Sequence, residues 1–232
     1  MLQIRTLVFN ILQENTYIVW KEGGRCAVVD PGFYTEAEGV TFFDTLAGLG
    51  LEVDAVLLTH AHTDHYSGTR AIQDKFGCKV YMNPADKVVF GMDTKMLQRI
   101  GIRVPDSGFT TTDITEGDVI RTAGMTFSVI NTPGHTPGGV CYLETDEKIV
   151  FTGDTLFAGT IGRTDFAYSD YDKEILSIME KVILLDPATE VLPGHGPRTT
   201  IGRERTQNPM LEPFNEPEEE FDPNLKGISI TR

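Results

Sequence analysis

The feature that most restricts the fold of this chain is a polar cluster directly after an apolar run. Residues 53–59, VDAVLLT, form an apolar run bounded by polar residues, a pattern typical of a strand buried on both faces. The segment HAHTDH follows at once and holds His60, His62, Asp64 and His65. Three of the five histidines of the chain therefore stand where one buried strand ends.

The other two histidines and one aspartate have similar surroundings. His135 lies in NTPGHTPGG and His195 in VLPGHGP, so each follows a Pro-Gly turn at the end of a predicted strand. Asp154 ends the apolar run IVFTGD. A single histidine of this kind is more often a hydrogen-bonded structural residue than a ligand. Five of them in loops at strand ends indicate a metal site.

The spacing within HAHTDH suits two adjacent metal ions. Side chains two residues apart share a face of an extended chain, so His60 and His62 can converge on one ion. If the chain then turns into a helix, Asp64 and His65 can reach a second ion. Imidazole and carboxylate ligands without thiolate favour zinc, iron or manganese, whereas magnesium or calcium would need more oxygen ligands.

Apolar patterns along the chain predict short strands interrupted by helices. Strands are expected at 3–9, 15–20, 26–30, 53–59, 79–83, 118–122, 125–132, 139–144, 148–154 and 189–192, and helices at 35–48, 64–76, 170–184 and after PGHGPRTT. This order favours two sheets packed face to face with helices outside, an α/β (α+β) arrangement. We assign residues 1–208 to one domain and 209–232 to an acidic, proline-containing C-terminal extension.

Composition argues against several classes of protein. A formal net charge of −14 opposes binding to nucleic acid, because phosphate contacts require dense Lys and Arg. The sequence has no apolar run of about 18 residues that would predict a membrane span. MLQIRTLVFN lacks a secretory pattern, so we expect a cytoplasmic protein without a membrane partner. Cys26, Cys78 and Cys141 stand singly in apolar segments, which predicts buried thiols.

The order of the motifs resembles that of the metallo-β-lactamase-fold hydrolases: HxHxDH at 60–65, Pro-Gly-His at 133–135, Gly-Asp-Thr at 153–155 and Pro-Gly-His at 193–195. The resemblance implies a four-layer αββα sandwich with metals at one edge, between the two sheets. By motif position it assigns His60, His62 and His135 to one metal, and Asp64, His65 and His195 to the other. Asp154 would bridge both ions.

Within that superfamily, GDTLFAGTIGRTDF and PGHGPRTTIGRERTQNPM resemble short bacterial glyoxalase II proteins, which are hydroxyacylglutathione hydrolases. The resemblance implies a thioesterase with a binuclear centre of two divalent ions. Zinc is the first expectation, and iron or manganese are the alternatives. A metal-bridging hydroxide would attack the thioester, with Asp64 orienting it and taking its proton. Arg163 falls at the loop position that faces glutathione in this family. The expected partner is a small-molecule thioester, with glutathione thioesters as candidates.

Other activities of the same fold stay open from the sequence. Persulfide dioxygenases are similar around GRTDF and use one iron, which His62, His135 and Asp154 would hold here. The complete second ligand set, above all His195, favours the two-metal hydrolase. A lactonase or β-lactamase would use the same carbonyl chemistry, and the net charge argues against a nuclease. A non-enzymatic metal-binding module is a further alternative, and the sequence leaves the oligomeric state open.

Overall fold

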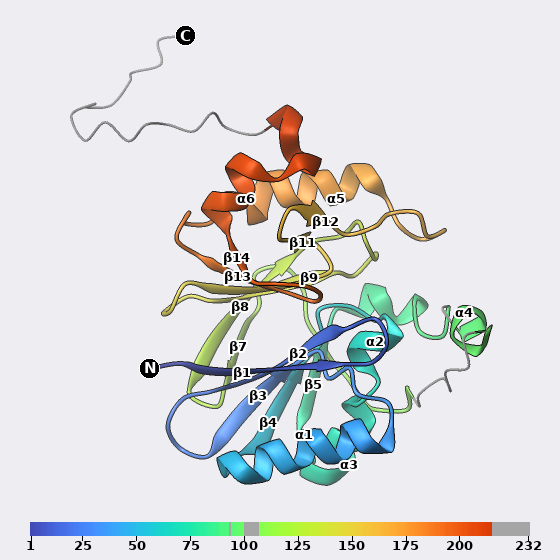
Figure 1. Ribbon diagram of the computed structural model, residues 1–232, viewed down its shortest axis with the longest axis vertical. Coiled ribbons are helices and arrows are strands. Elements are labelled where there is room, and N and C mark those ends of the chain that lie inside the picture. Colours follow the sequence, from blue (N-terminus) through green and yellow to red (C-terminus); the bar gives the residue numbers. More distant parts are fainter. Residues whose placement is uncertain (93, 100–106, 215–232) are drawn as a thin grey trace.

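Two six-stranded sheets lie face to face, and helices cover the outer side of each (Figure 1). The computed structural model describes residues 1–92, 94–99 and 107–214. Their hydrophobic side chains form one cluster between the sheets and one under the helices on each outer face. The four-layer αββα sandwich expected from the sequence is confirmed.

The N-terminal sheet has the strand order β1-β2-β3-β4-β5-β6. Strands β1 to β3 are antiparallel, and strands β3 to β6 are parallel. Helices α1 (Glu36–Leu49) and α3 (Thr69–Phe76) pack on the outer face through Phe42, Leu46 and Ile72. In chain order the strands are Gln3–Phe9, Glu14–Trp20, Arg25–Val29, Glu52–Leu57, Lys79–Met82 and Thr112–Asp113.

The second sheet has the order β14-β13-β10-β9-β8-β7. Helix α5 (Tyr171–Ser177), the π-helical turn η2 (Ile178–Val182) that continues it, and helix α6 (Ile201–Gln207) cover its outer face. From β7 to β10 the strands are Val119–Thr122, Met125–Asn131, Val140–Glu144 and Ile149–Gly153, and β13 and β14 are Glu190–Pro193 and Thr199–Thr200. A small hairpin, β11 (Leu156–Phe157) and β12 (Thr160–Ile161), follows β10.

Alternation along the strands sends one set of side chains into the space between the sheets. Val29 and Leu57 from the first sheet meet Phe127 and Phe151 from the second in the central cluster. The neighbouring residues Val28 and Val56 point the other way, into the cluster under α1 and α3. Strands buried on both faces in this way have few polar positions except at their ends, which is where the candidate site lies.

The prediction of a single helix at 64–76 is wrong. The structure divides this segment into α2 (Thr63–Tyr66) and α3. Between them the N–H of Gly68 donates to the carbonyl of Pro31 at 2.7 Å, and a Cβ at Gly68 would lie 2.3 Å from Cε1 of Phe33. The close approach to the loop after β3 therefore requires glycine and separates the two helices.

Helices with local signals match their predictions. Helix α1 begins at a capping box formed by Thr35 and Glu38, and it ends at Gly50, whose φ is 66°. The predicted helix at 170–184 is found as α5 and η2. One face of this segment is apolar, and its Ile178 and Val182 are fully buried in the outer cluster.

The remaining elements lie at the periphery. They are the turn η1 (Pro84–Val88), helix α4 (Thr94–Arg99) and the turn η3 (Pro209–Phe214). Leu211 of η3 packs into the outer cluster of the second sheet. The proposed division at residue 208 stays a prediction, because residues 215–232 lie outside the described part of the chain. The three cysteines are buried and free, which confirms the expected thiols.

No helix among the described residues has both the length and the apolar character needed to cross a bilayer.

Candidate metal centre

The residues singled out by the sequence meet at one edge of the sandwich. They follow the C-terminal ends of strands from both sheets: His60 after β4, His135 after β8, Asp154 after β10 and His195 after β13. Hydrogen bonds between the sheets fix this edge. The N–H of Val140 donates to the carbonyl of Thr59 at 2.9 Å, and the N–H of Asn15 donates to the carbonyl of Gly194 at 2.7 Å.

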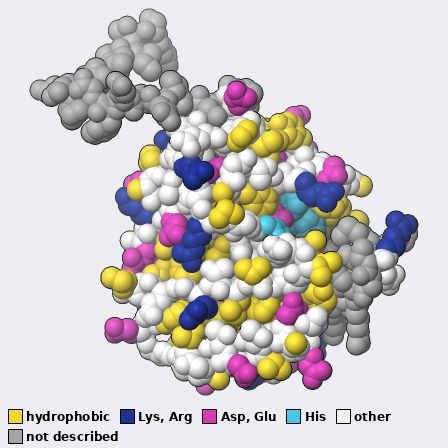
Figure 2. Space-filling model, in the orientation of Figure 1, with side chains coloured by type: hydrophobic (Ala, Val, Ile, Leu, Met, Phe, Trp, Pro, Cys, Tyr) yellow, Lys and Arg dark blue, Asp and Glu magenta, His cyan; other side chains and the backbone are white. Residues whose placement is uncertain are grey.

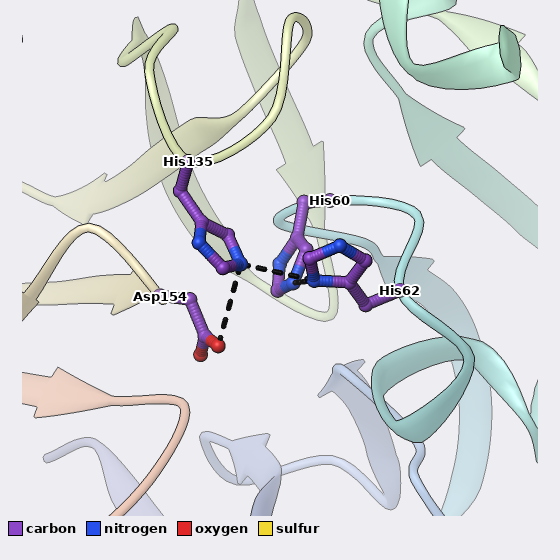
Figure 3. A group of neighbouring side chains, drawn as sticks. All are labelled: His60, His62, His135 and Asp154. Atoms are coloured by element: carbon purple, nitrogen blue, oxygen red, sulfur yellow. Dashed lines mark hydrogen bonds and ion pairs between the residues drawn. The ribbon is translucent and has the colours of Figure 1, made fainter. Parts of the chain in front are cut away.

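Three imidazole rings form the first ligand group. His62 Nδ1 lies 3.0 Å from His60 Nε2 and 2.9 Å from His135 Nε2. Asp154 Oδ2 lies 3.5 Å from His135 Nε2. Figure 3 shows the rings and the carboxylate pointing toward one another. A tetrahedral ion with bonds of about 2.0–2.1 Å would separate its ligands by about 3.3 Å, so this spacing suits a first-row divalent ion.

The second group combines carboxylates with the other two rings. Asp64 Oδ2 lies 3.3 Å from His195 Nε2 and 3.6 Å from His65 Nε2. The two ring nitrogens are 3.3 Å apart. His65 lies within the one-turn helix α2, so the expectation that all five histidines stand in loops is wrong for this residue. The helix brings Asp64 and His65 close to His195, and the assignment of these three residues to a second ion stays a prediction.

Asp154 stands between the two groups. Its Oδ1 lies 3.3 Å from His65 Nε2, and its Oδ2 lies 3.5 Å from His135 Nε2. Oδ1 is buried and accepts no hydrogen bond from the described residues. A buried carboxylate oxygen without a donor is costly unless a cation neutralises it. The donor set and this oxygen therefore both fit divalent metals.

The outer nitrogen of each ring lies within hydrogen-bond distance of an oxygen atom. His135 Nδ1 donates to the carbonyl of Arg163 at 2.7 Å, and His195 Nδ1 donates to the carbonyl of Leu12 at 3.0 Å. Because a carbonyl can only accept, the Nε2 atoms of both rings carry lone pairs that face the centre. His62 is reversed, with Nε2 at 2.7 Å from the hydroxyl of Tyr168 and Nδ1 facing inward.

Burial and nearby charges set the ionisation states. Burial, reinforced by His135, lowers the pKa of His62 to about 3. Burial opposes ionisation of Asp64, yet the neighbouring His65 and His195 bring its pKa well below the usual range. Burial likewise acts to lower the pKa of His65, but Asp154 and Asp64 raise it above its ordinary value. The carboxylates thus favour a positive charge at this position, which a metal or a proton can supply.

Asp30 and Thr59 were missed by the sequence reasoning. Asp30 follows β3 and is buried; its Oδ2 lies 3.0 Å from His65 Nδ1 and accepts from Thr59 Oγ1 at 2.6 Å. Thr59 Oγ1 in turn lies 3.0 Å from His60 Nδ1. One carboxylate therefore orients a ring in each group. The signal was present, because Asp30 ends an apolar run in VVDPG as Asp154 does in VFTGD.

Two further buried acids were also missed, because they stand far from any motif. Asp86 of η1 accepts from the N–H of Ala61 at 2.8 Å and from Thr136 Oγ1 at 2.9 Å, so it ties together the loops that carry His62 and His135. Glu174 of α5 accepts from the N–H of His135 at 2.8 Å. Burial raises the pKa of Glu174 to about 8.

A cavity of about 390 Å³ opens beside the ligand groups. Its wall includes Arg163, the loop residue expected to face the substrate. The guanidinium donates to both oxygens of Asp165 at 2.7 Å and lies 4.5 Å from the ring centre of Phe166. Arg163 thus stands at the cavity, but its charge is paired with that of Asp165.

The second Pro-Gly-His motif requires glycine at position 194 because side chains of the candidate site lie too close for a Cβ. A Cβ at Gly194 would lie 2.3 Å from Asp154 Oδ1 and 2.6 Å from His65 Cε1. Freedom to adopt a positive φ is not the reason for a glycine at position 194, because Gly194 is not among the residues with positive φ. The backbone of this loop forms part of the wall of the centre, so no side chain fits there.

Comparison with known proteins agrees with this geometry. Residues 10–195 match the model of the metallo-beta-lactamase superfamily. The chain belongs to this superfamily. It is 34% identical over 216 residues to the hydroxyacylglutathione hydrolase GloC of Haemophilus influenzae, a match that covers 90% of this chain and 98% of that protein.

Two crystal structures resemble the chain over most of its length. The B3 metallo-beta-lactamase BLEG-1 is 31% identical with a TM-score of 0.81, and TTHA1623 in a di-iron-bound form is 34% identical with a TM-score of 0.76. Each match covers 89% of this chain and 98% of the other. Fold, ligand groups and relatives together support a metal-dependent hydrolase.

Proposed function

We propose that the chain hydrolyses small-molecule thioesters with two divalent ions. His60, His62 and His135 would hold one ion, and Asp64, His65 and His195 the other. Asp154 would bridge them. The observation that carries this proposal is the orientation of the five rings: the outer nitrogen of each ring lies within hydrogen-bond distance of an oxygen atom, and each inner nitrogen faces one of the two groups. Residues 1–208 would form the catalytic domain.

The residues of the site divide the catalytic work. When bound, the two ions would lower the pKa of a shared water toward 7 and polarise the thioester carbonyl. Asp64 is the residue placed to orient the attacking oxygen and accept its proton, because its carboxylate lies at the cavity beside the second group. The thiolate is a good leaving group, so no additional acid is needed for its departure.

The relatives support the choice of substrate and leave the metal to be measured. GloC is a hydroxyacylglutathione hydrolase and is similar along nearly its whole length. The Arg163 guanidinium lies at the cavity and would bind a carboxylate of a glutathione thioester there. Its ion pair with Asp165 would break, which costs little because the pair is exposed to solvent. Zinc is the first expectation, with iron or manganese as alternatives. The di-iron form of TTHA1623 supports testing iron.

A panel of substrates tests the proposal. Protein loaded with zinc or iron is assayed with S-lactoylglutathione, a lactone, a β-lactam and glutathione persulfide, the last by oxygen uptake. We expect hydrolysis of the thioester at least about 100-fold faster in kcat/KM than that of the lactone or β-lactam, a difference of about 2.7 kcal/mol. Oxygen uptake by an iron-loaded protein without thioester hydrolysis would instead establish a dioxygenase.

A further inference from the structure

The cavity beside the ligand groups has two chemically different ends. Phe166 and Arg163 lie at the end near the first group, where the Phe166 ring centre is 5.1 Å from that of His62. Leu12 and Phe157 lie at the other end, and both contact His195 of the second group. The Leu12 carbonyl accepts from the ring, and the Phe157 ring centre lies 6.3 Å away.

Apolar side chains dominate the wall. Among the described residues that line the cavity, those other than Arg163 and the proposed ligands are Leu12, Leu97, Phe157, Ile161 and Phe166. All five are apolar. Figure 2 shows histidine side chains reaching this face of the molecule next to hydrophobic side chains. Apolar surface of this kind at a reaction centre favours an apolar part of a ligand.

The position of Leu12 is fixed by a network below it. Asn10 accepts from the N–H of Leu12 at 2.9 Å through Oδ1, and its Nδ2 donates to the carbonyls of Gly32 at 3.1 Å and Asp64 at 3.2 Å. Leu12 is nevertheless 44% exposed. The backbone of Leu12 is thus fixed at the cavity, and its exposed aliphatic side chain is available to be covered by a ligand.

We infer that the site prefers thioesters with an apolar acyl chain, and that this chain lies against Leu12 and Phe157 while the thiol lies toward Arg163 and Phe166. The inference rests on the proposed thioesterase function and refines its substrate. Arg163 is the single Lys or Arg side chain in the described wall, so an anionic thiol such as glutathione belongs at its end of the cavity. The carbonyl then lies between the two ligand groups, and the acyl chain extends toward the apolar end.

A series of S-acylglutathiones tests this arrangement. Acetyl, butanoyl, hexanoyl and octanoyl thioesters share one thiol and differ only in chain length. Full burial of a methylene is worth about 0.8 kcal/mol, or about fourfold in kcat/KM, so we expect a rise of about two- to fourfold per methylene until the cavity is filled. S-lactoylglutathione should rank near the acetyl thioester.

Two neighbouring variants separate the apolar end from a general surface effect. Leu12→Ser should lower kcat/KM for the hexanoyl thioester by about tenfold and for the acetyl thioester by less than about twofold. Ile11→Ser is the matched control, since Ile11 is 59% exposed and does not line this cavity. Its chain-length profile should equal that of the unmodified protein.

The outcomes distinguish this inference from the function on which it rests. Equal rates for acetyl and octanoyl thioesters, or a chain-length profile unchanged by Leu12→Ser, would overturn the placement of the acyl chain while leaving thioester hydrolysis established. Absence of turnover with every thioester in the series, by protein that carries its metals, would overturn the proposed function itself.

Discussion

The two ligand groups differ in how firmly the fold holds them. The first consists of three rings, His60, His62 and His135, which are 2%, 7% and 4% exposed and stand on strand-end loops of both sheets. The second combines Asp64 with His65 and His195, and the side chain of His195 is 25% exposed at the cavity. Because all three rings of the first group are buried, we expect it to be the tighter of the two proposed metal sites. The second is the accessible one, where water and substrate can approach.

The largest effect is expected from the residue that the two groups share. Asp154→Ala should lower the metal content of both sites and reduce kcat/KM by more than about 100-fold, beyond the 10–100-fold typical of outer partners of a ligand. Asp186→Ala is the control, because Asp186 pairs with Lys148 at the surface. Metal analysis together with thioester turnover measures both. Unchanged occupancy in Asp154→Ala would contradict a bridging role.

Variants that remove one proposed ligand from either group should differ in how tightly they hold the remaining metal ion. His195→Ala should retain about one metal ion per chain in the buried group and resist a moderate chelator. His60→Ala should retain its ion only in the exposed group and lose it to the same chelator. Metal analysis before and after dialysis against the chelator measures how much metal each variant retains. If the residual ions leave both variants equally easily, the two groups do not differ in strength.

A smaller effect on metal affinity is expected from Tyr168, which contacts the outer nitrogen of His62. Tyr168→Phe removes the hydroxyl at 2.7 Å from His62 Nε2, which leaves the outer nitrogen of this ligand without that partner. Loss of such a partner costs about 10–100-fold in metal affinity, and the loss should fall on the first ion. Competition with a fluorescent chelator measures it. Tyr171→Phe, at an exposed position of α5, should match the unmodified protein; equal affinities in both variants would refute a role for Tyr168.

A further prediction concerns stability, not activity or metal content, around the first group. Burial raises the pKa of Glu174 to about 8, so the folded state favours its protonated form. Its contribution to stability is therefore complete at pH below about 4.5 and is lost as pH rises toward 8, by at most about 1.36 kcal/mol per pH unit. Glu174→Gln should flatten this decline in urea unfolding of chelator-treated protein. Glu180→Gln, on the exposed side of η2, should retain it. Parallel profiles for the two variants would exclude Glu174 as the source.

Much of the fold and of the ligand groups could be predicted because their signals are local. Apolar runs place strand ends, and His60, His135 and His195 stand directly after them. Side-chain contacts between distant segments carry no such signal. The break of the helix at Gly68 depends on Phe33, and Asp86 connects two loops from an element that contains none of the motifs. Arg163 lines the cavity, and its proposed role in substrate binding stays a prediction; its pairing with Asp165 required the structure.

Stepwise reconstitution of chelator-treated protein measures how many metal ions thioester hydrolysis requires. Metal content and S-acylglutathione hydrolysis are measured on the same samples as zinc, and separately iron, is added. We expect two ions per chain, with the first bound tightly and little turnover until the second is present. Full thioester turnover at one ion per chain, or saturation at one ion with oxygen uptake in place of hydrolysis, would contradict it.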